Sequence, residues 1–580
     1  MVFYTIMSIS RRKVLCLVAV AGALVKLAEL LVWRESYFRF YHLVPGLDME
    51  TLLRFGEWGE KGNGFFFTPH RALIAAWWAL KGHSHYVTGI VAVQSLFGIM
   101  GAVLCADLAL KLFDRDRIAA LACGLFYLLY GPFFIYEFSV LQEAVSLNLI
   151  LLAFHAAVSA RGRRGFVWAG TALGLCVVGR PTALFFVPLM LGFMAYRELK
   201  ARRRPWKSAA KKLLPALAGA FAVLCLVSIA NRTFGGNWSC FFDVMPYSLE
   251  YNAGAGGGPA PGNPYCLMLV NAVKRAPQMF MPTEIPENLN YCFLCRKMPF
   301  LNALPGPGTL LPLALAGMLL LIPKLRRPAA LALLPILALV LPLCVREPIG
   351  RYRLTMIPYF ILCAGYWVHF AKSKPWKLKV PVAAGAAAAC LALLLPTYRS
   401  DLLRSDDYLA WAIAANPGKP NGEALPILAE GWEKGGFRNN KLGLMLYRQL
   451  EELSEGEKAF KVLVIGAQNS PENDIYLYYL AFRFANMGNF AAAEQVLSRT
   501  DPGKLGELAG SYHFLYAEML RLRGEKTKAA EHYRRVVALL DPQTNYAVIS
   551  RKYLSEFVPA PDAAGASGTT PPPPAAPSRE

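Results

Sequence analysis

Long apolar runs alternate with short polar links over roughly the first 396 residues of the chain. The runs lie at 14–33, 86–113, 118–136, 139–160, 166–196, 213–230, 309–322, 328–345, 352–370 and 380–396. A run of about 20 apolar residues matches the length that a helix needs to cross a bilayer. The pattern therefore predicts an all-α, polytopic membrane domain over residues 1–398.

The fifth run, 166–196, is too long for one upright crossing. It is interrupted by Gly179-Arg180-Pro181, and a proline inside a helix removes a backbone hydrogen bond and clashes with the preceding turn. We therefore interpret this run as two short spans that meet at a turn. The predicted number of crossings becomes eleven.

Basic residues concentrate in the links, and this distribution sets the predicted orientation. Lys and Arg in short links near span ends are retained on the cytoplasmic side. With a cytoplasmic N-terminus, six basic links all fall in the cytoplasm: 11–13, 111–117, 161–164, 197–212, 324–327 and 372–379. The other side then receives a first loop at 34–85, a second loop at 231–308 and everything after residue 396. We predict a multi-pass protein of the bacterial inner membrane.

After about residue 402 the apolar runs stop and an amphipathic helical pattern begins. Ala459, Ala493 and Ala529 recur at spacings of 34 and 36 residues, and small residues at such points let paired helices approach closely. The segments YYLAFRFANMGNFAAAEQVL and FLYAEMLRLRGEKTKAAEHYRRVV resemble tetratricopeptide repeats. We expect an extracytoplasmic α-helical repeat domain over 399–558 and a disordered Pro/Ala tail over 559–580. An unrelated helical bundle is the alternative.

Composition agrees with a membrane protein, because 55% of the residues are hydrophobic and only 17% are charged. The formal net charge of +22 would favour nucleic-acid binding if the basic residues formed a stripe on a soluble domain. Here they lie in the links between apolar runs. We expect no nucleic-acid partner.

Ionisable side chains gather at the predicted outer ends of the spans. Such residues at membrane depth are costly, and they are therefore candidates for a functional site. They are Asp48, Glu50, Glu137, Glu143, Arg180, Arg346, Arg351 and Arg353. Carboxylates and guanidinium groups are thus expected to meet at one water interface.

These groups match the chemistry of sugar transfer from a lipid phosphate. A carboxylate can accept the proton of a hydroxyl nucleophile, and an Arg fork can hold a phosphate through two parallel hydrogen bonds. The expected donor is a polyprenyl-phosphate sugar, whose tail stays in the bilayer, and the acceptor is a protein or a glycan that the repeats recruit. No dedicated cofactor or metal site is predicted, and a need for a divalent metal is left open.

Four segments resemble the GT-C glycosyltransferases, particularly the bacterial relatives of dolichyl-phosphate-mannose protein mannosyltransferases. They are similar to the first external loop of that family, its Arg-Pro turn, its Gly/Asn-rich external loop and its late Arg-Tyr-Arg segment. In this chain they read PGLDMETLLRFGEWGEKGNGFFFTPHRALIAA, VVGRPTALFFVPLML, YNAGAGGGPAPGNPY and GRYRLTMIPYFILCAG. The resemblance covers residues 10–396 and implies a GT-C-like fold with protein glycosylation as the activity.

The resemblance implies that Asp48 is the catalytic base, because the family uses an Asp after the first span. Family members often carry a second acid beside the first one. Here Met49 follows Asp48 and the next acid is Glu50, so both carboxylates stay candidates.

The other candidate residues have two expected roles: some orient the acceptor or the sugar, and some bind the phosphate. Glu143 or Glu137, together with His70, would orient the acceptor or the sugar. The cations that would stabilise the departing phosphate are Arg351, Arg353, Arg180 and Arg346. A single displacement would invert the anomeric centre.

Structural roles are the alternative for each of these groups. Asp48 could cap an interfacial helix, since Asp is favoured at that position. Arg351 and Arg353 could anchor the chain to lipid head groups. The two glutamates at the junction of the third and fourth spans could form an ion pair with Arg180.

Four cysteines lie in the predicted second loop: Cys240, Cys266, Cys292 and Cys295. In an oxidising compartment one or two disulfides are expected among them. A zinc site is less favoured, because a single C-x-x-C without a second pair is weak evidence for a metal.

Three other functions are compared with the pattern. An O-antigen polymerase or ligase would also have many spans, but its key Arg and His residues would lie in one large loop, and 231–308 contains no His. A membrane-anchored repeat scaffold without catalysis would not need so many spans. A transporter would carry its charges near the midplane of the bilayer.

Overall fold

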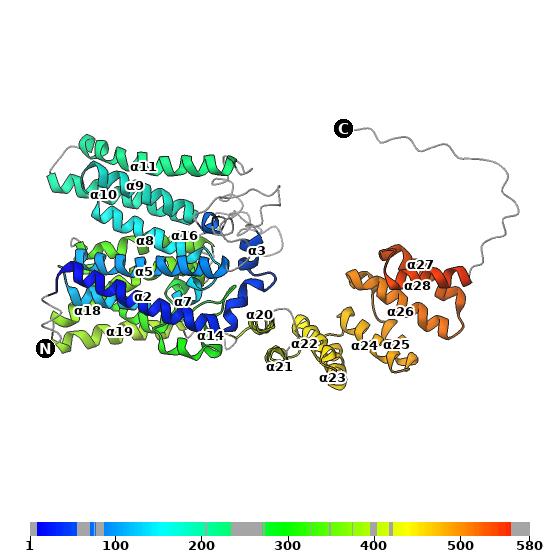
Figure 1. The fold of residues 1–580 in the computed structure, drawn as a ribbon. Coiled ribbons are helices and arrows are strands. Elements are labelled where there is room, and N and C mark those ends of the chain that lie inside the picture. Colours follow the sequence, from blue (N-terminus) through cyan, green and yellow to red (C-terminus); the bar gives the residue numbers. More distant parts are fainter. Residues whose placement is uncertain are drawn as a thin grey trace, which may run out of the picture. The chain divides into compact units, whose positions relative to one another are not determined.

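The computed structural model describes residues 9–54, 70–74, 76, 86–202, 206–233, 270, 273–325, 328–346, 350–373, 375–394, 403–416 and 422–557. The chain divides into two compact units, Met1–Pro417 and Gly418–Glu580. Each unit is described by itself. The ribbon in Figure 1 gives the element labels used below.

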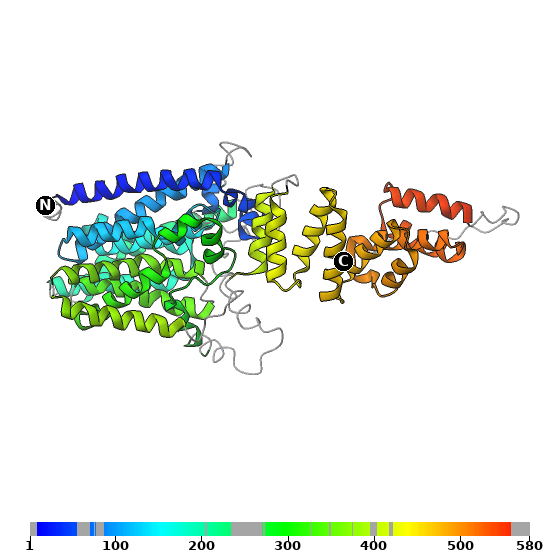
Figure 2. The ribbon, with the colours of Figure 1, turned by 90° about the horizontal axis from the view of Figure 1, so that it is seen from below.

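The first unit is a bundle of long helices, which run side by side in both views (Figure 1 and Figure 2). They are α2 (Arg11–Glu35), α5 (Tyr86–Leu112), α6 (Arg117–Leu129), α7 (Gly131–Glu137), α8 (Glu143–Ser159), α9 (Gly162–Gly179), α10 (Phe186–Arg202), α11 (Trp206–Thr233), α15 (Pro307–Leu321), α16 (Leu333–Arg346), α18 (Ile357–Ser373) and α19 (Trp376–Leu394). Each predicted apolar run coincides with one or two of these helices.

Shorter elements connect the long helices. They are η1 (Tyr37–Leu43), α3 (Asp48–Arg54), η2 (Pro181–Phe185), η3 (Ala276–Phe280), α14 (Tyr291–Lys297), η4 (Pro299–Ala303), η5 (Ile322–Lys324), η6 (Pro328–Ala332), α17 (Gly350–Arg353), η7 (Leu354–Met356) and α20 (Ser405–Ala415). No strand occurs among the residues that the structure describes. The all-α, multi-span fold class is therefore confirmed.

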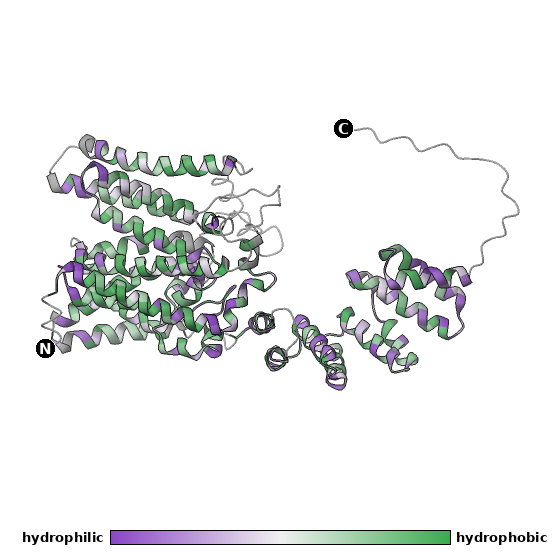
Figure 3. Cartoon of the chain, in the orientation of Figure 1, coloured by the Kyte–Doolittle hydropathy of each residue, from purple (hydrophilic) through white to green (hydrophobic). Residues whose placement is uncertain are grey.

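Six helices of the described chain are long and apolar enough to cross a membrane, and a seventh span results if α6 and α7 count as one span bent by 52°. Three shorter apolar helices, Glu143–Ser159, Pro328–Val340 and Lys379–Leu391, coincide with further predicted crossings. Figure 3 shows hydrophobic residues along the middle of these helices and hydrophilic ones mainly towards their ends. The count of eleven crossings and the orientation of the termini stay predictions.

The predicted break in the fifth run is confirmed. Helix α9 ends at Gly179, Arg180 adopts an extended backbone with φ −155° and ψ 108°, and η2 begins at Pro181. Proline disfavours the helical conformation in the residue before it, which accounts for the extended Arg180. The break turns the Arg180 side chain out of the regular helix register.

Close helix packing depends on glycine at α9. A Cβ added at Gly170 would lie 1.8 Å from the carbonyl oxygen of Ala216, so no larger residue fits between α9 and α11. Glycine at this position allows the two helix backbones to make close van der Waals contact, and helix association inside a bilayer relies on such small residues at the interface.

The second unit consists of helices joined by short turns. They are α21 (Ala424–Lys434), α22 (Asn440–Glu452), α23 (Gly456–Asn469), α24 (Asp474–Asn486), α25 (Phe490–Leu497), α26 (Ala509–Leu522), α27 (Lys526–Leu539) and α28 (Asn545–Phe557). Gly488 and Gly524 have φ of 76° and 83° in the turns that follow α24 and α26. Glycine adopts this left-handed conformation without steric cost, which explains the recurrence of Gly at these points.

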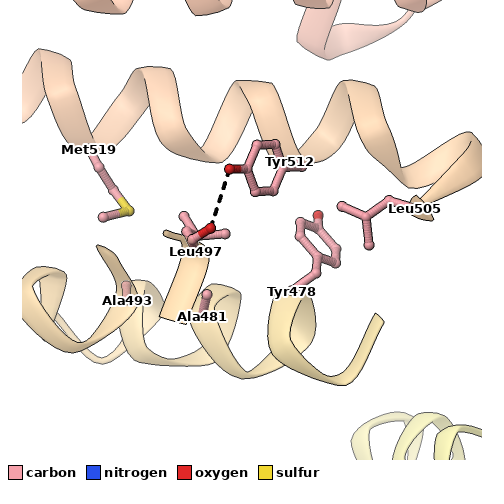
Figure 4. Close-up of a cluster of buried hydrophobic side chains, with 7 residues drawn as sticks. All are labelled: Tyr478, Ala481, Ala493, Leu497, Leu505, Tyr512 and Met519. Carbon is pink, nitrogen blue, oxygen red and sulfur yellow. Dashed lines mark hydrogen bonds between the residues drawn. The ribbon is translucent and has the colours of Figure 1, made fainter. Parts of the chain in front are cut away.

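The recurring alanines of the second unit lie in its core. Ala459, Ala493 and Ala529 are fully buried, as their spacing predicted. Figure 4 shows Ala481, Ala493, Leu497 and Tyr512 in one buried cluster, in which the Tyr512 hydroxyl donates to the carbonyl of Leu497 at 3.3 Å. Because each helix pair buries its apolar face against the next, the unit depends on stacking.

The division between the units falls after residue 417, later than the boundary predicted after residue 398. Helix α20 accounts for the difference, because it packs on the first unit. Trp411 of α20 lies 5.9 Å from Tyr37 and from Tyr41 and 6.1 Å from Phe293, measured between ring centroids. The sequence pattern of an amphipathic helix does not indicate which unit its apolar face packs against.

Candidate functional site

Asp48 is the first residue of α3, the short helix that follows α2 and η1. Gly46 precedes it with φ 82°, which allows the tight turn between η1 and α3. Met49 and Leu53 are buried and fix the helix, whereas the Asp48 side chain is 49% exposed. The carboxylate is therefore held in place and open to solvent.

Arg351 reaches Asp48 from the far end of the first unit's sequence. It lies in α17, and its Nη1 donates a hydrogen bond to Oδ2 of Asp48. The two residues are 303 positions apart, so only the fold brings them together. The Arg351 side chain is 14% exposed.

Glu287 holds the other side of the same guanidinium. Nη2 of Arg351 donates to Oε1 of Glu287 at 2.9 Å, and its Nε lies 2.5 Å from Oε2. Nη2 also donates to the Tyr352 hydroxyl at 3.1 Å. Arg351 is thus bracketed by two carboxylates, both of which water can reach.

A second layer lies against the Tyr352 ring. The guanidinium carbons of Arg351 and Arg180 each lie 4.9 Å from the ring centroid, a distance at which cations are attracted to an aromatic face. Two like charges therefore share one ring. Their mutual repulsion favours an anion in their vicinity.

Glu143 supplies a buried carboxylate to this layer. It begins α8, is 1% exposed, and its Oε1 lies 4.0 Å from Nη1 of Arg180. Neither carboxylate oxygen has a hydrogen-bond partner among the described residues. A buried carboxylate without hydrogen bonds is costly, which marks it as a group available to a ligand.

Arg353, predicted to bind phosphate, is placed differently. It is fully buried and donates to the carbonyls of Met281 and Thr283 at 2.6 and 2.7 Å and to Oε2 of Glu284 at 2.9 Å. Gly350 packs directly on Glu284. Because two carbonyls and a carboxylate occupy Nη1 and Nη2, Arg353 holds the 281–284 segment in place, and its part in phosphate binding stays a prediction.

Glu137 belongs to a separate cluster inside the bundle. Its Oε2 lies 2.6 Å from Nζ of Lys26, which also lies 2.7 Å from Glu29. All three are buried, and Glu137 packs against Gly98 of α5. The structure thus pairs Glu137 with Lys26, and the alternative of an ion pair with Arg180 holds for Glu143 alone.

Three other candidates contribute less. His70 is buried, and burial followed by the charge of Arg71 lowers its pKa to about 3. Neither ring nitrogen of His70 has a hydrogen-bond partner among the described residues, so its imidazole is neutral. The backbones of Glu50 and Arg346 lie in α3 and α16, and their side chains lie outside the described part.

The predicted disulfides fall partly outside the described chain. Cys240 and Cys266 are not among the described residues, whereas Cys292 and Cys295 of α14 are free thiols. Burial raises the pKa of Cys292 to about 11, so its sulfur is protonated. These two cysteines are not joined to each other, and any pairing with the other two stays a prediction.

Sequence reasoning missed Glu287 and Tyr352. The available signal was the segment PTEIPENLN, in which Glu284 and Glu287 stand at i, i+3 on either side of a proline in the second predicted loop. For Tyr352 the signal was its position between Arg351 and Arg353, two of the predicted site residues. No group of three or more His, Cys, Asp or Glu residues in the described chain is arranged to hold a metal ion.

No protein-family model matches the chain, and no curated protein sequence matches it significantly. Among solved structures, the chain is similar to ArnT from Cupriavidus metallidurans bound to undecaprenyl phosphate, with 15% identity and a TM-score of 0.36 over 94% of this chain and 85% of that chain. The apo form of ArnT gives 15% identity and a TM-score of 0.35 over 92% and 84% of the two chains.

Proposed function

We propose that this protein transfers a sugar from a polyprenyl-phosphate donor to an acceptor hydroxyl on the extracytoplasmic face of the membrane, as an inverting enzyme of the GT-C type. The contact between Asp48 and Arg351 carries the proposal. It joins a solvent-accessible carboxylate to a guanidinium at the end of a set of membrane-capable helices. The four segments that resemble GT-C enzymes include both residues and agree with the proposal.

Asp48 is the base of the proposed reaction. Its carboxylate accepts the proton of the acceptor hydroxyl while that oxygen forms a bond to the anomeric carbon. The bond between the anomeric carbon and the phosphate oxygen breaks, and its electron pair stays on the phosphate. The products are the glycosylated acceptor and the polyprenyl phosphate.

Arg351 and Arg180 stabilise the phosphate as its negative charge grows. The planar fork of Arg351 suits two phosphate oxygens, because its nitrogens already hold carboxylate oxygens of Asp48 and Glu287. The donor phosphate takes the place of one carboxylate at this fork. Glu143, which is buried and whose carboxylate has no hydrogen-bond partner among the described residues, accepts from sugar hydroxyls that enter the same layer.

The test is a donor panel with matched variants. Purified protein is incubated with polyprenyl-phosphate sugars and candidate acceptors, and release of polyprenyl phosphate is measured. Asp48→Asn removes the base while keeping the side chain's shape, so turnover should fall by about 100-fold or more, within the range for general-base catalysis. Glu35→Gln is the control, because Glu35 is an exposed acid at the end of α2.

Two results would contradict the proposal. Near-normal turnover in the Asp48→Asn variant, with Glu35→Gln unchanged, would remove Asp48 from the reaction. Failure of wild-type protein to consume any donor, together with capture of partners by the repeats, would favour the scaffold. The donor and the acceptor that react in this panel identify the sugar and the acceptor of the enzyme.

A further inference from the structure

A large cavity lies at the other end of the first unit from Asp48. Its volume is about 1210 Å³, and it is lined by the start of α2, the end of α5 with the turn into α6, the ends of α8 and α10, and Leu325, Pro328 and Leu331. Helix α2 has 25 residues and is therefore about 38 Å long, with Arg11 at one end and α3 beyond the other (Figure 1). The cavity is thus distinct from the candidate site.

The cavity wall is strongly basic. Seven of its side chains are Lys or Arg, and Asp114 is its single acid. Retention of cations on one side of the membrane accounts for basic residues at this end. It does not account for their arrangement around one hollow, where like charges repel each other.

Three of the cations are already bonded. Arg11 donates to Asp107 at 2.8 and 2.9 Å, and Lys111 lies 2.8 Å from the same carboxylate. Arg197 donates to the carbonyls of Val158 and Ala160 at 2.8 and 2.5 Å. These contacts fix the walls without neutralising the remaining charge.

The other four have no carboxylate partner among the described residues. They are Arg115, Arg117, Arg161 and Lys200. Lys200 lies 5.7 Å from the ring centroid of Tyr196, and the guanidinium groups of the three arginines make no hydrogen bond or ion pair with the residues that the structure describes. Four cations around one cavity repel each other, and an anion with several oxygen atoms would offset that repulsion.

The turn that carries Arg115 is held in an unusual shape. Asp114 and Arg115 have φ of 50° and 60°, a conformation that side chains other than glycine rarely adopt. Asp116 secures the turn, since it caps α6 and lies 2.8 Å from His369 and 2.7 Å from Lys372. Backbone strain that the surroundings maintain is typical of functional sites.

The remaining lining is apolar and continuous with a lipid-facing surface. Phe193 and Tyr196 come from α10, a membrane-capable helix, and Leu325 comes from the segment opposite. Tyr196 and Leu325 are 58% and 66% exposed. A basic hollow with such an apolar side, at the end of the spans, lies where lipid head groups lie.

We propose that this cavity binds the phosphate head group of a membrane lipid, with Arg115, Arg117, Arg161 and Lys200 around the phosphate and the lipid tail leaving along Tyr196 and Leu325. This site goes beyond the proposed transferase and does not depend on it. A phospholipid diester and a polyprenyl phosphate monoester share the chemistry that the cavity recognises.

The test measures lipid binding to the full chain in neutral detergent by native mass spectrometry and by competition. The probes are phosphatidylglycerol, undecaprenyl phosphate, phosphatidylcholine and inorganic phosphate. The cavity variant combines Arg115→Gln, Arg117→Gln and Arg161→Gln. The control combines Arg12→Gln, Arg163→Gln and Arg164→Gln, which removes the same charge from exposed positions at the same end.

The cavity variant should raise the Kd of the anionic lipids by about 100-fold, since each near-surface cation is worth about five-fold, while the control stays close to wild type. The tighter of the two anionic lipids identifies the natural source of the phosphate. Lys200→Gln alone, with an expected rise of about five-fold, keeps the test decisive if the triple variant does not fold.

Three outcomes would overturn the proposal. Equal loss in the cavity variant and the control would reduce the effect to general surface charge. Inorganic phosphate that displaces the lipid at the lipid's own concentration would mean that the tail contributes nothing. Absence of saturable binding for both anionic lipids would remove the site.

Discussion

At the scale of single residues, the two arginines of the GRYR segment have different tasks although they stand two positions apart. Arg351 meets carboxylates that water can reach, whereas Arg353 is enclosed by carbonyls and Glu284. The sequence predicted that both would lie near the candidate site. It did not distinguish them, because their surroundings come from residues 281–287, far away in the chain.

Replacement of each arginine by Met should separate these tasks. Arg353→Met leaves Glu284 buried without a partner and should lower the free energy of unfolding by about 3 to 5 kcal/mol. Arg351→Met frees carboxylates that water solvates, so its stability cost should be about 1 kcal/mol or less while donor turnover falls. Thermal unfolding and polyprenyl-phosphate release measure the two effects. A larger loss of stability in Arg351→Met than in Arg353→Met would contradict the assignment.

A histidine pair in the second unit gives a pH prediction at the same scale. Nδ1 of His513 lies 3.1 Å from Nδ1 of His532, and His532 stacks on Tyr516 at 4.7 Å. Burial, followed by the charges of His532 and Arg535, lowers the pKa of His513 to about 4, and burial also lowers that of His532.

Because the folded state favours neutral rings, protonation favours unfolding. The stability that the pair contributes is complete above the ordinary pKa of about 6.5 and is lost as pH falls towards 4. We expect the melting temperature, followed by circular dichroism, to drop between pH 7.5 and pH 5. His532→Gln should reduce that drop, and an unchanged drop would exclude the pair as its source.

At the scale of elements, hydrophobic periodicity predicted where the helices lie better than what they cover. The break at Arg180 followed from Pro181, and the alanine spacing predicted the helix pairs of the second unit. The sequence pattern places helix α20 in the repeat domain, because an amphipathic face does not indicate which unit it packs against. Its contact with Tyr37 and Phe293 depends on the tertiary structure and cannot be predicted from the local sequence.

The buried alanines of the second unit should not tolerate larger residues. Ala529 of α27 is fully buried, and Ala529→Leu inserts a larger side chain that should cost about 1 to 3 kcal/mol of stability. Ala538→Leu on the same helix is the control, because Ala538 is exposed. Chemical denaturation of both variants measures the difference, and equal stabilities would contradict close packing at Ala529.

At the scale of the whole molecule, the orientation in the membrane rests on the distribution of Lys and Arg. The fold places Asp48 and Arg351 at one end of the first unit and the basic cavity at the other. This separation could be predicted from the sequence. Each apolar run carries the chain to the opposite side of the membrane, so the number of runs before a residue predicts its side. The cavity itself could not, because its walls come from five segments.

Cysteine labelling tests the orientation. Lys13 lies in the first turn of α2, at its basic end, and Lys552 lies in α28; each is replaced by Cys. In intact spheroplasts a membrane-impermeant maleimide should label Lys552→Cys, and it should label Lys13→Cys only after permeabilisation. The parent protein supplies the background of native cysteines. Labelling of Lys13→Cys in intact cells would reverse the assignment of both ends.

The contact of Asp48 with Arg351 bears on how tightly the proposed donor binds. The Arg351 guanidinium already donates to the Asp48 carboxylate, so another anion at the same nitrogen must displace that carboxylate. In the proposed reaction the donor must break this contact before either side chain can act, and part of its own binding free energy is consumed in doing so. We therefore expect the affinity for the donor to be weaker than the number of its contacts would imply.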